Sequence, residues 1–171
     1  MRVIGSLVLA LYFSYSALAA VDVTCIGGDC LTQGWRWRHT ETFAHGRVEC
    51  MGKDCRTIGW YGTSVTGEYF ESYCAFLGCW VQGWEVVNYS GQTVAQAWCH
   101  RGGVEGESDC LTYGWTVHPP GWPNQVLLSI HCIQNDCRKN GWEILERGRV
   151  FPQRAHCKPG GCLTEGWYLY H

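Results

Sequence analysis

Cys25-Ile-Gly-Gly-Asp-Cys30-Leu-Thr-Gln-Gly34-Trp35 is the stretch from which the organisation of the whole chain follows. It is the first of six copies of one pattern, in which two cysteines precede a Gly-Trp pair and the second cysteine lies five positions before the tryptophan. Successive tryptophans of the pattern are 25, 24, 31, 27 and 25 residues apart, which is the regular spacing of a repeat protein. The six copies are Cys25/Cys30/Trp35, Cys50/Cys55/Trp60, Cys74/Cys79/Trp84, Cys99/Cys110/Trp115, Cys132/Cys137/Trp142 and Cys157/Cys162/Trp167.

The first 19 residues have the pattern of a secretory signal peptide. Arg2 gives a positive start, residues 3–15 are almost wholly apolar, and Ala17-Leu-Ala19 places small residues where signal peptidase reads the chain. We expect cleavage after Ala19 and a single cysteine-rich repeat domain over residues 20–171, secreted to the extracellular space. An uncleaved anchor is the rival interpretation. No later segment is apolar over about 18 residues, so no membrane span is expected in the mature chain.

Twelve cysteines behind a signal peptide predict a disulfide framework without a free thiol. In five copies only four residues separate the two cysteines, and most of these residues are turn formers. Bridges between neighbouring repeats remain an alternative, as do zinc sites, which an oxidising compartment disfavours. We expect pairing within each repeat, because a short turn brings its flanking residues opposite each other: Cys25–Cys30, Cys50–Cys55, Cys74–Cys79, Cys99–Cys110, Cys132–Cys137 and Cys157–Cys162.

Short alternating segments flank each cysteine pair, as in Val21-Asp-Val23 before the first pair and Trp35-Arg-Trp37 after it. A period of two predicts half-buried strands, and no segment has a convincing helical period. The predicted fold is all-β, with six disulfide-tipped β-hairpin repeats, about 12 short antiparallel strands and no helix. The hairpins either stack as a solenoid or close into a propeller-like or trefoil-like ring. The near equivalence of the six units favours the stack.

The alternation raises a question of register. If Cys25 faces Cys30 across the hairpin, Val23 lies on the cysteine face of the sheet and Trp35 lies on the opposite face. Glycine permits both a β-bulge and a close approach of two backbones. We therefore expect the glycine before each repeat tryptophan to form a bulge that turns the indole to the other face.

Composition and motifs exclude several classes of function. The chain has 13 basic and 15 acidic residues, a formal net charge of −2, whereas nucleic-acid binding needs a basic face. It contains no nucleophile elbow, no zinc-protease motif, no phosphate-binding glycine loop and no dinucleotide fingerprint. We expect a non-enzymatic protein, without catalytic residues, cofactors or nucleic-acid partners.

The potential metal ligands do not form a pattern. The seven histidines share no position of the repeat. In four copies an aspartate precedes the second cysteine, but one carboxylate per turn falls short of the six to eight oxygens that calcium takes. Aspartate also commonly caps such turns. We therefore expect no metal site, and we assign turn capping to Asp29, Asp54, Asp109 and Asp136.

The ten tryptophans fall into two groups. The six of the repeat are predicted to form the core, because short strands need their large apolar area. Four others lie outside the pattern: Trp37, Trp80, Trp98 and Trp122. Aromatic faces with hydrogen-bonding edges suit saccharide and peptide ligands. Trp122, which lies between prolines, is the best candidate for exposure.

The fourth unit departs from the others in two places. Ten residues instead of four separate Cys99 from Cys110, and the arm that follows contains Pro119-Pro-Gly-Trp122-Pro. Inserted loops on rigid scaffolds often bind ligands. We therefore place a candidate binding site here, made of Trp122, Arg101, Glu105 and Glu107. Separately, Asn88-Tyr-Ser is a sequon that makes Asn88 a candidate glycosylation site.

The functional hypothesis is a secreted, non-enzymatic binding protein that presents aromatic-rich hairpins to an extracellular ligand. The ligand is a glycan, which would make the protein lectin-like, or a matrix or cell-surface protein. An extracellular structural component and a secreted defence or toxin-like protein remain the alternatives. A binding protein should gather its exposed aromatic side chains on one face, whereas a structural component should show a self-associating edge.

Overall fold

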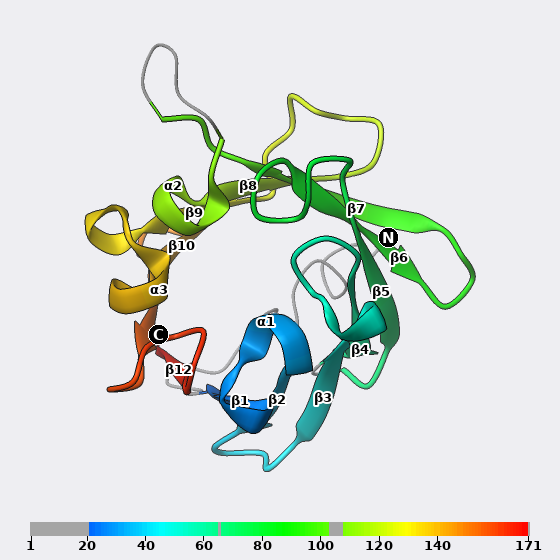
Figure 1. The fold of residues 1–171 in the computed structure, drawn as a ribbon. Coiled ribbons are helices and arrows are strands. Elements are labelled where there is room, and N and C mark those ends of the chain that lie inside the picture. The colour runs from blue at the N-terminus through cyan, green and yellow to red at the C-terminus, as the bar shows by residue number, and fades with distance from the viewer. Residues whose placement is uncertain (1–20, 65, 103–107, 171) are drawn as a thin grey trace.

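The computed structural model describes residues 21–64, 66–102 and 108–170, so the expected signal peptide lies outside the described residues. Twelve antiparallel strands form one closed barrel, in which each strand pairs with its sequence neighbours and β12 pairs with β1 (Figure 1). The strands are β1 (Val21–Cys25), β2 (Trp35–His39), β3 (His45–Cys50), β4 (Gly59–Thr63), β5 (Tyr69–Cys74), β6 (Gly83–Asn88), β7 (Thr93–Cys99), β8 (Trp115–His118), β9 (Leu128–Cys132), β10 (Trp142–Glu146), β11 (Gln153–Cys157) and β12 (Gly166–Tyr170).

The all-β class and the disulfide-tipped hairpins are confirmed, but the expected solenoid and the propeller-like or trefoil-like ring are wrong. The hairpins join edge to edge through hydrogen bonds instead of stacking. Trp35 pairs with Cys25 of its own hairpin on one side and with Val48 of the next hairpin on the other. Closing the sheet on itself leaves no strand edge unpaired.

The register of the strands sets the size of the barrel. Trp35 pairs with Val48, which lies two residues before Cys50, and the same step of two recurs at the five other junctions between units. Six steps of two give a shear of twelve for twelve strands. Equal shear and strand number correspond to a strand tilt of about 36°. A barrel of this size is wider than the eight-stranded barrels that ordinary side chains fill.

The tryptophans of the repeat occupy much of this width. Each indole contacts the next around the inside of the barrel, with ring centroids 5.0–6.2 Å apart and planes inclined by 52–62°. The last contact, between Trp167 and Trp35, closes the circle. The expectation that these residues form the core is therefore confirmed. We call this set, which consists of Trp35, Trp60, Trp84, Trp115, Trp142 and Trp167, the tryptophan ring.

The disulfides lie together at one end of the barrel. Each joins the two cysteines of one repeat, with Cα atoms 4.4–4.6 Å apart, and no cysteine of the described residues is free. We call this the disulfide end, and the opposite end, which holds the turns between units, the turn end. Six disulfides suggest that the protein folds in an oxidising environment.

Helical turns are present, which corrects the expectation of no helix. α1 (Cys30–Gln33), α2 (Cys110–Tyr113) and α3 (Cys137–Asn140) each begin at the second cysteine of a repeat, and 3₁₀ turns cover Ile26–Gly28, Met51–Lys53 and Ile133–Asn135. The preceding aspartate caps each α-turn. Asp29, for example, accepts a hydrogen bond from the backbone of Leu31 at 2.8 Å and one from the hydroxyl of Thr32 at 2.9 Å. The side chain of each of these aspartates is therefore occupied within its own turn.

The same turns answer the question of register. Cys25 pairs with Trp35 and not with Cys30, because the whole segment 26–34 is the loop of the hairpin. Cys25 and Trp35 consequently lie on the same inner face without a bulge at Gly34, and the expected bulge is wrong. Gly34 instead has φ +82°, and a Cβ there would collide with the carbonyl oxygen of Val48 on the next unit. The glycine permits the close approach of neighbouring hairpins.

Of the four tryptophans outside the pattern, two pack inside the barrel and two lie on its outer surface. Trp37 is buried inside, where its indole donates to the carbonyl oxygen of Thr63 at 3.1 Å. Trp80 directly follows Cys79 and stacks on Trp60 of the tryptophan ring, with centroids 5.9 Å apart. Trp98 and Trp122 are on the outside, 51% and 67% exposed.

Candidate functional site

The structure separates the residues that the sequence placed in one site. Trp122 lies in the arm that follows β8 at the turn end, where its backbone N–H donates to the carbonyl of Pro119 at 3.2 Å. Arg101 lies before α2 at the disulfide end, in an isolated bridge with Ser108. Glu105 and Glu107 fall outside the described residues. The two described members of the predicted site are thus at opposite ends of β8, and they do not meet.

Asn88 ends β6 and takes part in a local turn. Its side-chain oxygen accepts hydrogen bonds from the backbone and the hydroxyl of Ser90 at 3.0 and 2.7 Å, and from the backbone of Gln92 at 2.9 Å. Tyr89, between them, is 84% exposed. The sequon lies on an accessible turn, and its glycosylation stays a prediction.

A groove on the outer face crosses β5, β6 and β7. It has a volume of about 250 Å³ and is lined by, among others, Tyr73, Gln82, Glu85, Gln96 and Trp98. We call it the β5–β7 groove. Tyr73 is 40% exposed and Trp98 is 51% exposed, so both rings are accessible to a ligand.

The strand pairing places the two rings on either side of β6. Tyr73 pairs with Glu85 of β6, and Trp98 pairs with Gly83, so no side chain stands opposite Trp98 on β6. Strands two positions apart in a sheet are separated by about 9–10 Å. A flat molecule between two rings needs about 3.5–4.0 Å on each side. Tyr73 is level with Gln96 on β7, two residues from Trp98, so the two rings flank the floor of the groove diagonally, and the space between them is wider than one flat ring requires.

The floor of the groove offers hydrogen-bonding groups. Glu85 and Gln96 are cross-strand partners on the outer face, and Gln82 lies at the disulfide end of the groove. Glu85 accepts one hydrogen bond of 3.4 Å from Thr93, which leaves most of the acceptor capacity of its carboxylate. The amides of Gln82 and Gln96 can both donate and accept. A ligand with several hydroxyl groups would find partners for them here.

Each aromatic wall is supported from outside the groove. The hydroxyl of Tyr73 donates to Glu71, which also accepts from Tyr69 at 2.9 Å. This bond to Glu71 raises the pKa of Tyr73 above its ordinary value. On the other side, the ring of Trp98 packs against the imidazole of His118, with the ring centroids 6.1 Å apart. Burial lowers the pKa of His118, which keeps that imidazole neutral. The two rings are thus held apart by fixed neighbours.

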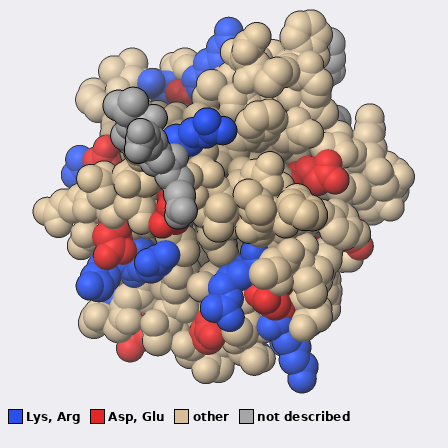
Figure 2. Space-filling view, turned by 45° about the horizontal axis from the view of Figure 1, so that its top comes forward, with Lys and Arg blue, Asp and Glu red and all other residues tan. Residues whose placement is uncertain are grey.

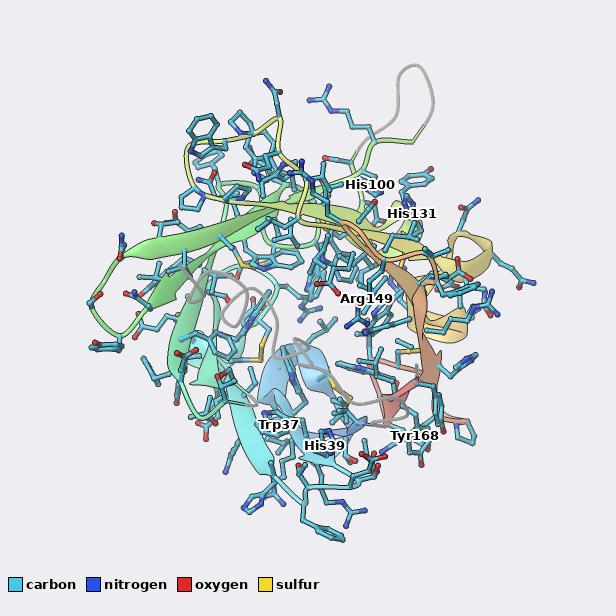
Figure 3. The ribbon with its side chains drawn as sticks, turned by 180° about the vertical axis from the view of Figure 1, so that it is seen from behind. Trp37, His39, His100, His131, Arg149 and Tyr168 are labelled. Atoms are coloured by element: carbon cyan, nitrogen blue, oxygen red, sulfur yellow. A yellow bond between two sulfur atoms is a disulfide. The ribbon has the colours of Figure 1, made fainter. Side chains whose placement is uncertain are left out.

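A pair of histidines beside the groove, at the end of β7 and on β9, is the main rival site. The rings of His100 and His131 lie 5.1 Å apart, and Figure 3 shows them together beside the strands of the fourth and fifth units. His100 contacts the carbonyl of Tyr113 at 3.0 Å, and His131 contacts the hydroxyl of Ser129 at 2.8 Å. Burial, and next the neighbouring His100, lower the pKa of His131. Within the described residues no group of three or more potential ligands converges on a metal position.

The charges of the surface do not single out another site. Figure 2 shows lysines and arginines interspersed with aspartates and glutamates on the face that it presents. Several of them form exposed pairs, such as Arg154 with Glu143 at 2.7 Å and Arg47 with Glu49 at 2.8 Å. None of the helices in residues 21–64, 66–102 and 108–170 is long and apolar enough to span a bilayer.

Comparisons with protein-family models, with curated proteins and with solved structures give no match. The chemistry of the β5–β7 groove therefore carries the functional argument. Sequence reasoning noted Trp98 as a tryptophan outside the pattern but did not select it or Tyr73. Both residues directly precede the first cysteine of a unit, and this shared position, aromatic in two adjacent units, was the available signal.

Proposed function

We propose that the protein is a secreted, non-enzymatic binding protein that holds a carbohydrate in the β5–β7 groove. The observation that carries the proposal is the pair of exposed rings, Tyr73 and Trp98, on either side of a floor that bears Glu85 and Gln96. The apolar face of a sugar ring packs on aromatic rings, and its hydroxyls pair with carboxylate and amide groups.

The volume of the groove limits the size of the ligand that it can hold. Its 250 Å³ lie below the range of about 300–1,000 Å³ that encloses drug-sized ligands. We therefore expect the groove to hold one sugar residue, such as the terminal residue of a larger glycan. The disulfide framework suits an extracellular role, because it keeps the strands that carry the two rings in place without a ligand.

A glycan-array screen of the oxidised protein, followed by calorimetry with the best ligand, tests the proposal. We expect Trp98→Ala and Tyr73→Ala each to weaken binding at least tenfold, which is about 1.4 kcal/mol. Trp122→Ala is the matched control, since it removes an exposed indole that lies outside the groove.

Two results would contradict the proposal. One is the absence of any glycan whose binding depends on Trp98. The other is a loss of binding in Trp122→Ala with unchanged binding in the two groove variants, which would move the site to the arm of the fourth unit.

A further inference from the structure

A cavity of about 110 Å³ lies inside the barrel at the disulfide end. All six members of the tryptophan ring line it, together with Trp80. Ser72 is the one residue with a hydroxyl group in its lining, and no charged side chain of the described residues lines it. The cavity is therefore apolar, and half of its 16 lining residues are aromatic.

The cavity exists because the ring of indoles does not reach the axis of so wide a barrel. The residues that directly follow the second cysteines cover it from the disulfide end. In four units this residue is apolar and lines the cavity: Leu31, Trp80, Leu111 and Leu163. In the second and fifth units, which are opposite each other in the ring of six, the equivalent residues are Arg56 and Arg138.

Both arginines turn away from the cavity. Arg56 lies 3.6 Å from Asp54 and Arg138 lies 3.9 Å from Asp109, and both side chains are more than half exposed. The apolar cover is therefore incomplete at two opposite positions. Trp35 and Trp84, which flank the second unit, are partly exposed, whereas Trp115 and Trp167, which flank the fifth unit, are buried, so the gap that exposes indoles is the one at Arg56. A small molecule can consequently enter from the disulfide end.

Three indoles in the lining have unused hydrogen-bond donors. The Nε1 atoms of Trp80, Trp142 and Trp167 are buried and have no acceptor in the part of the chain that the structure describes. Trp37 lies outside the lining, and its indole N–H donates to the carbonyl oxygen of Thr63. An indole on the inner face of the barrel can therefore find a backbone acceptor, which the three indoles of the lining do not have. A buried donor without a partner destabilises the folded state, and a ligand that accepts from it removes this cost.

We infer that this cavity binds a small, neutral, planar molecule that carries one hydrogen-bond acceptor. Flat rings suit the aromatic walls, and an acceptor would take a bond from one of the three free indole N–H groups. A cation fits less well, because no carboxylate lines the cavity and the free N–H groups present positive charge. The site differs from the β5–β7 groove, since it lies inside the barrel and Trp84 is the one lining residue that the two share.

The volume sets the size of the ligand. An engineered apolar cavity of about 150 Å³ stays dry and binds benzene or xenon. The present cavity has a smaller volume, but its apolar cover is incomplete at the disulfide end. A single six-membered ring is therefore the expected occupant. Water is the competing occupant, because it can accept from the free N–H groups, but it leaves most of the apolar lining without contacts.

The test compares benzene with pyridine, which have the same shape and differ by one acceptor. At mildly alkaline pH pyridine is neutral, and titration of the wild-type protein is followed through the indole N–H signals in nitrogen–proton NMR spectra. We expect both to bind, pyridine at least as tightly as benzene, with the largest shifts at Trp80, Trp142 or Trp167. Tetramethylammonium is the third probe, and we expect no binding.

Other outcomes overturn the inference. If neither ring binds, the cavity is only a packing void. If benzene binds more than tenfold more tightly than pyridine, the free N–H groups are not used. If tetramethylammonium binds best, the site is an aromatic cage for cations.

Two variants test where the ring binds, and each introduces the residue that another unit has at the equivalent position. Leu163→Trp copies the residue of the third unit into the cover, and Ser72→Ile copies Ile130, which occupies the equivalent position in the fifth unit. Each fills the cavity from a different side, and we expect each to weaken binding of both rings at least tenfold. Trp98→Ala should leave it unchanged, which separates this site from the groove. Unaltered binding in a folded Leu163→Trp or Ser72→Ile variant would refute the location, and if neither folds, the wild-type shifts decide.

Discussion

Trp84 and Trp98 lie on neighbouring strands, β6 and β7, yet they have opposite roles. Trp84 points inward and contacts Trp60 and Trp115 in the tryptophan ring. Trp98 points outward, is half exposed and contacts His118. The width of a twelve-stranded barrel requires the first indole, since smaller side chains would leave the interior empty. The width of the barrel does not require the second indole, and the proposed carbohydrate site uses its exposed ring.

The largest expected effect is the loss of an inner indole. Trp142 is 5% exposed, and Trp142→Ala should destabilise the protein by about 3–5 kcal/mol, because it removes a large apolar side chain and leaves a cavity. Trp98→Ala should cost less than about 1 kcal/mol, as is usual for exposed positions. Urea denaturation of the oxidised variants measures both. Equal losses at the two positions would mean that the inner and outer indoles do not differ as described.

The second effect concerns the disulfides that hold the hairpin loops. Replacing Cys50 and Cys55 together by alanine should cost about 2 kcal/mol, because a short ring restrains the unfolded chain only modestly. The same change at Cys99 and Cys110, which enclose a longer loop, should cost about 3 kcal/mol. Chemical denaturation of the two double variants gives the comparison. A loss well above these figures would show that a disulfide also positions the tryptophan ring.

The sequence predicted the residues inside the barrel better than the residues of the outer groove. The repeat of Cys, Gly and Trp identified every residue of the tryptophan ring, because a core position recurs wherever the same packing recurs. Closure into a barrel was missed, since it depends on hydrogen bonds such as those between β1 and β12, and no local pattern records them. The inward direction of Trp35 was attributed to a bulge, because the helical turn at Cys30 is too short to give a period.

The groove was harder to predict for a related reason. Tyr73 and Trp98 are 25 residues apart in the chain, and only the pairing of β5, β6 and β7 brings them to one surface. Trp122 was selected because its prolines marked an insertion. It is indeed exposed, but exposure alone does not place polar groups around a ring.

A third prediction uses the tyrosines beside the groove. Burial, and then the hydrogen bond to Glu71, raise the pKa of Tyr69 to about 12, against about 10 for a free tyrosine. The folded state thus favours the neutral phenol. Its contribution to stability is complete below pH 10 and is lost as the pH rises from 10 to 12. The pKa values of Tyr61 and Tyr73 are also raised, so ultraviolet titration of tyrosinate should show one late-ionising group fewer in Tyr69→Phe than in the wild type. A full titration near pH 10 would contradict the assignment.

The smallest effect is expected in the fourth unit, where the first interpretation of the sequence placed the site. A variant that lacks Arg101 and residues 104–108 has His-Gly-Gly-Asp between the cysteines, which has the length of the Ile-Gly-Gly-Asp of the first unit and matches its last three residues. Asp109 caps α2 as Asp29 caps α1, so the shortened loop keeps its helical turn. Stability should change by less than about 1 kcal/mol, since the cost of closing a loop depends only weakly on its length.

The same variant discriminates between the two candidate surfaces. If the β5–β7 groove is the carbohydrate site, the shortened loop and Trp122→Ala should both bind glycan within about twofold of the wild type, a difference below 0.5 kcal/mol. The reason is geometric, because Arg101 and Trp122 lie at opposite ends of β8 and neither lines the groove. Calorimetry with one glycan across these two variants and Trp98→Ala gives the comparison under identical conditions. A tenfold loss in the loop variant with Trp98→Ala unaffected would return the function to the fourth unit.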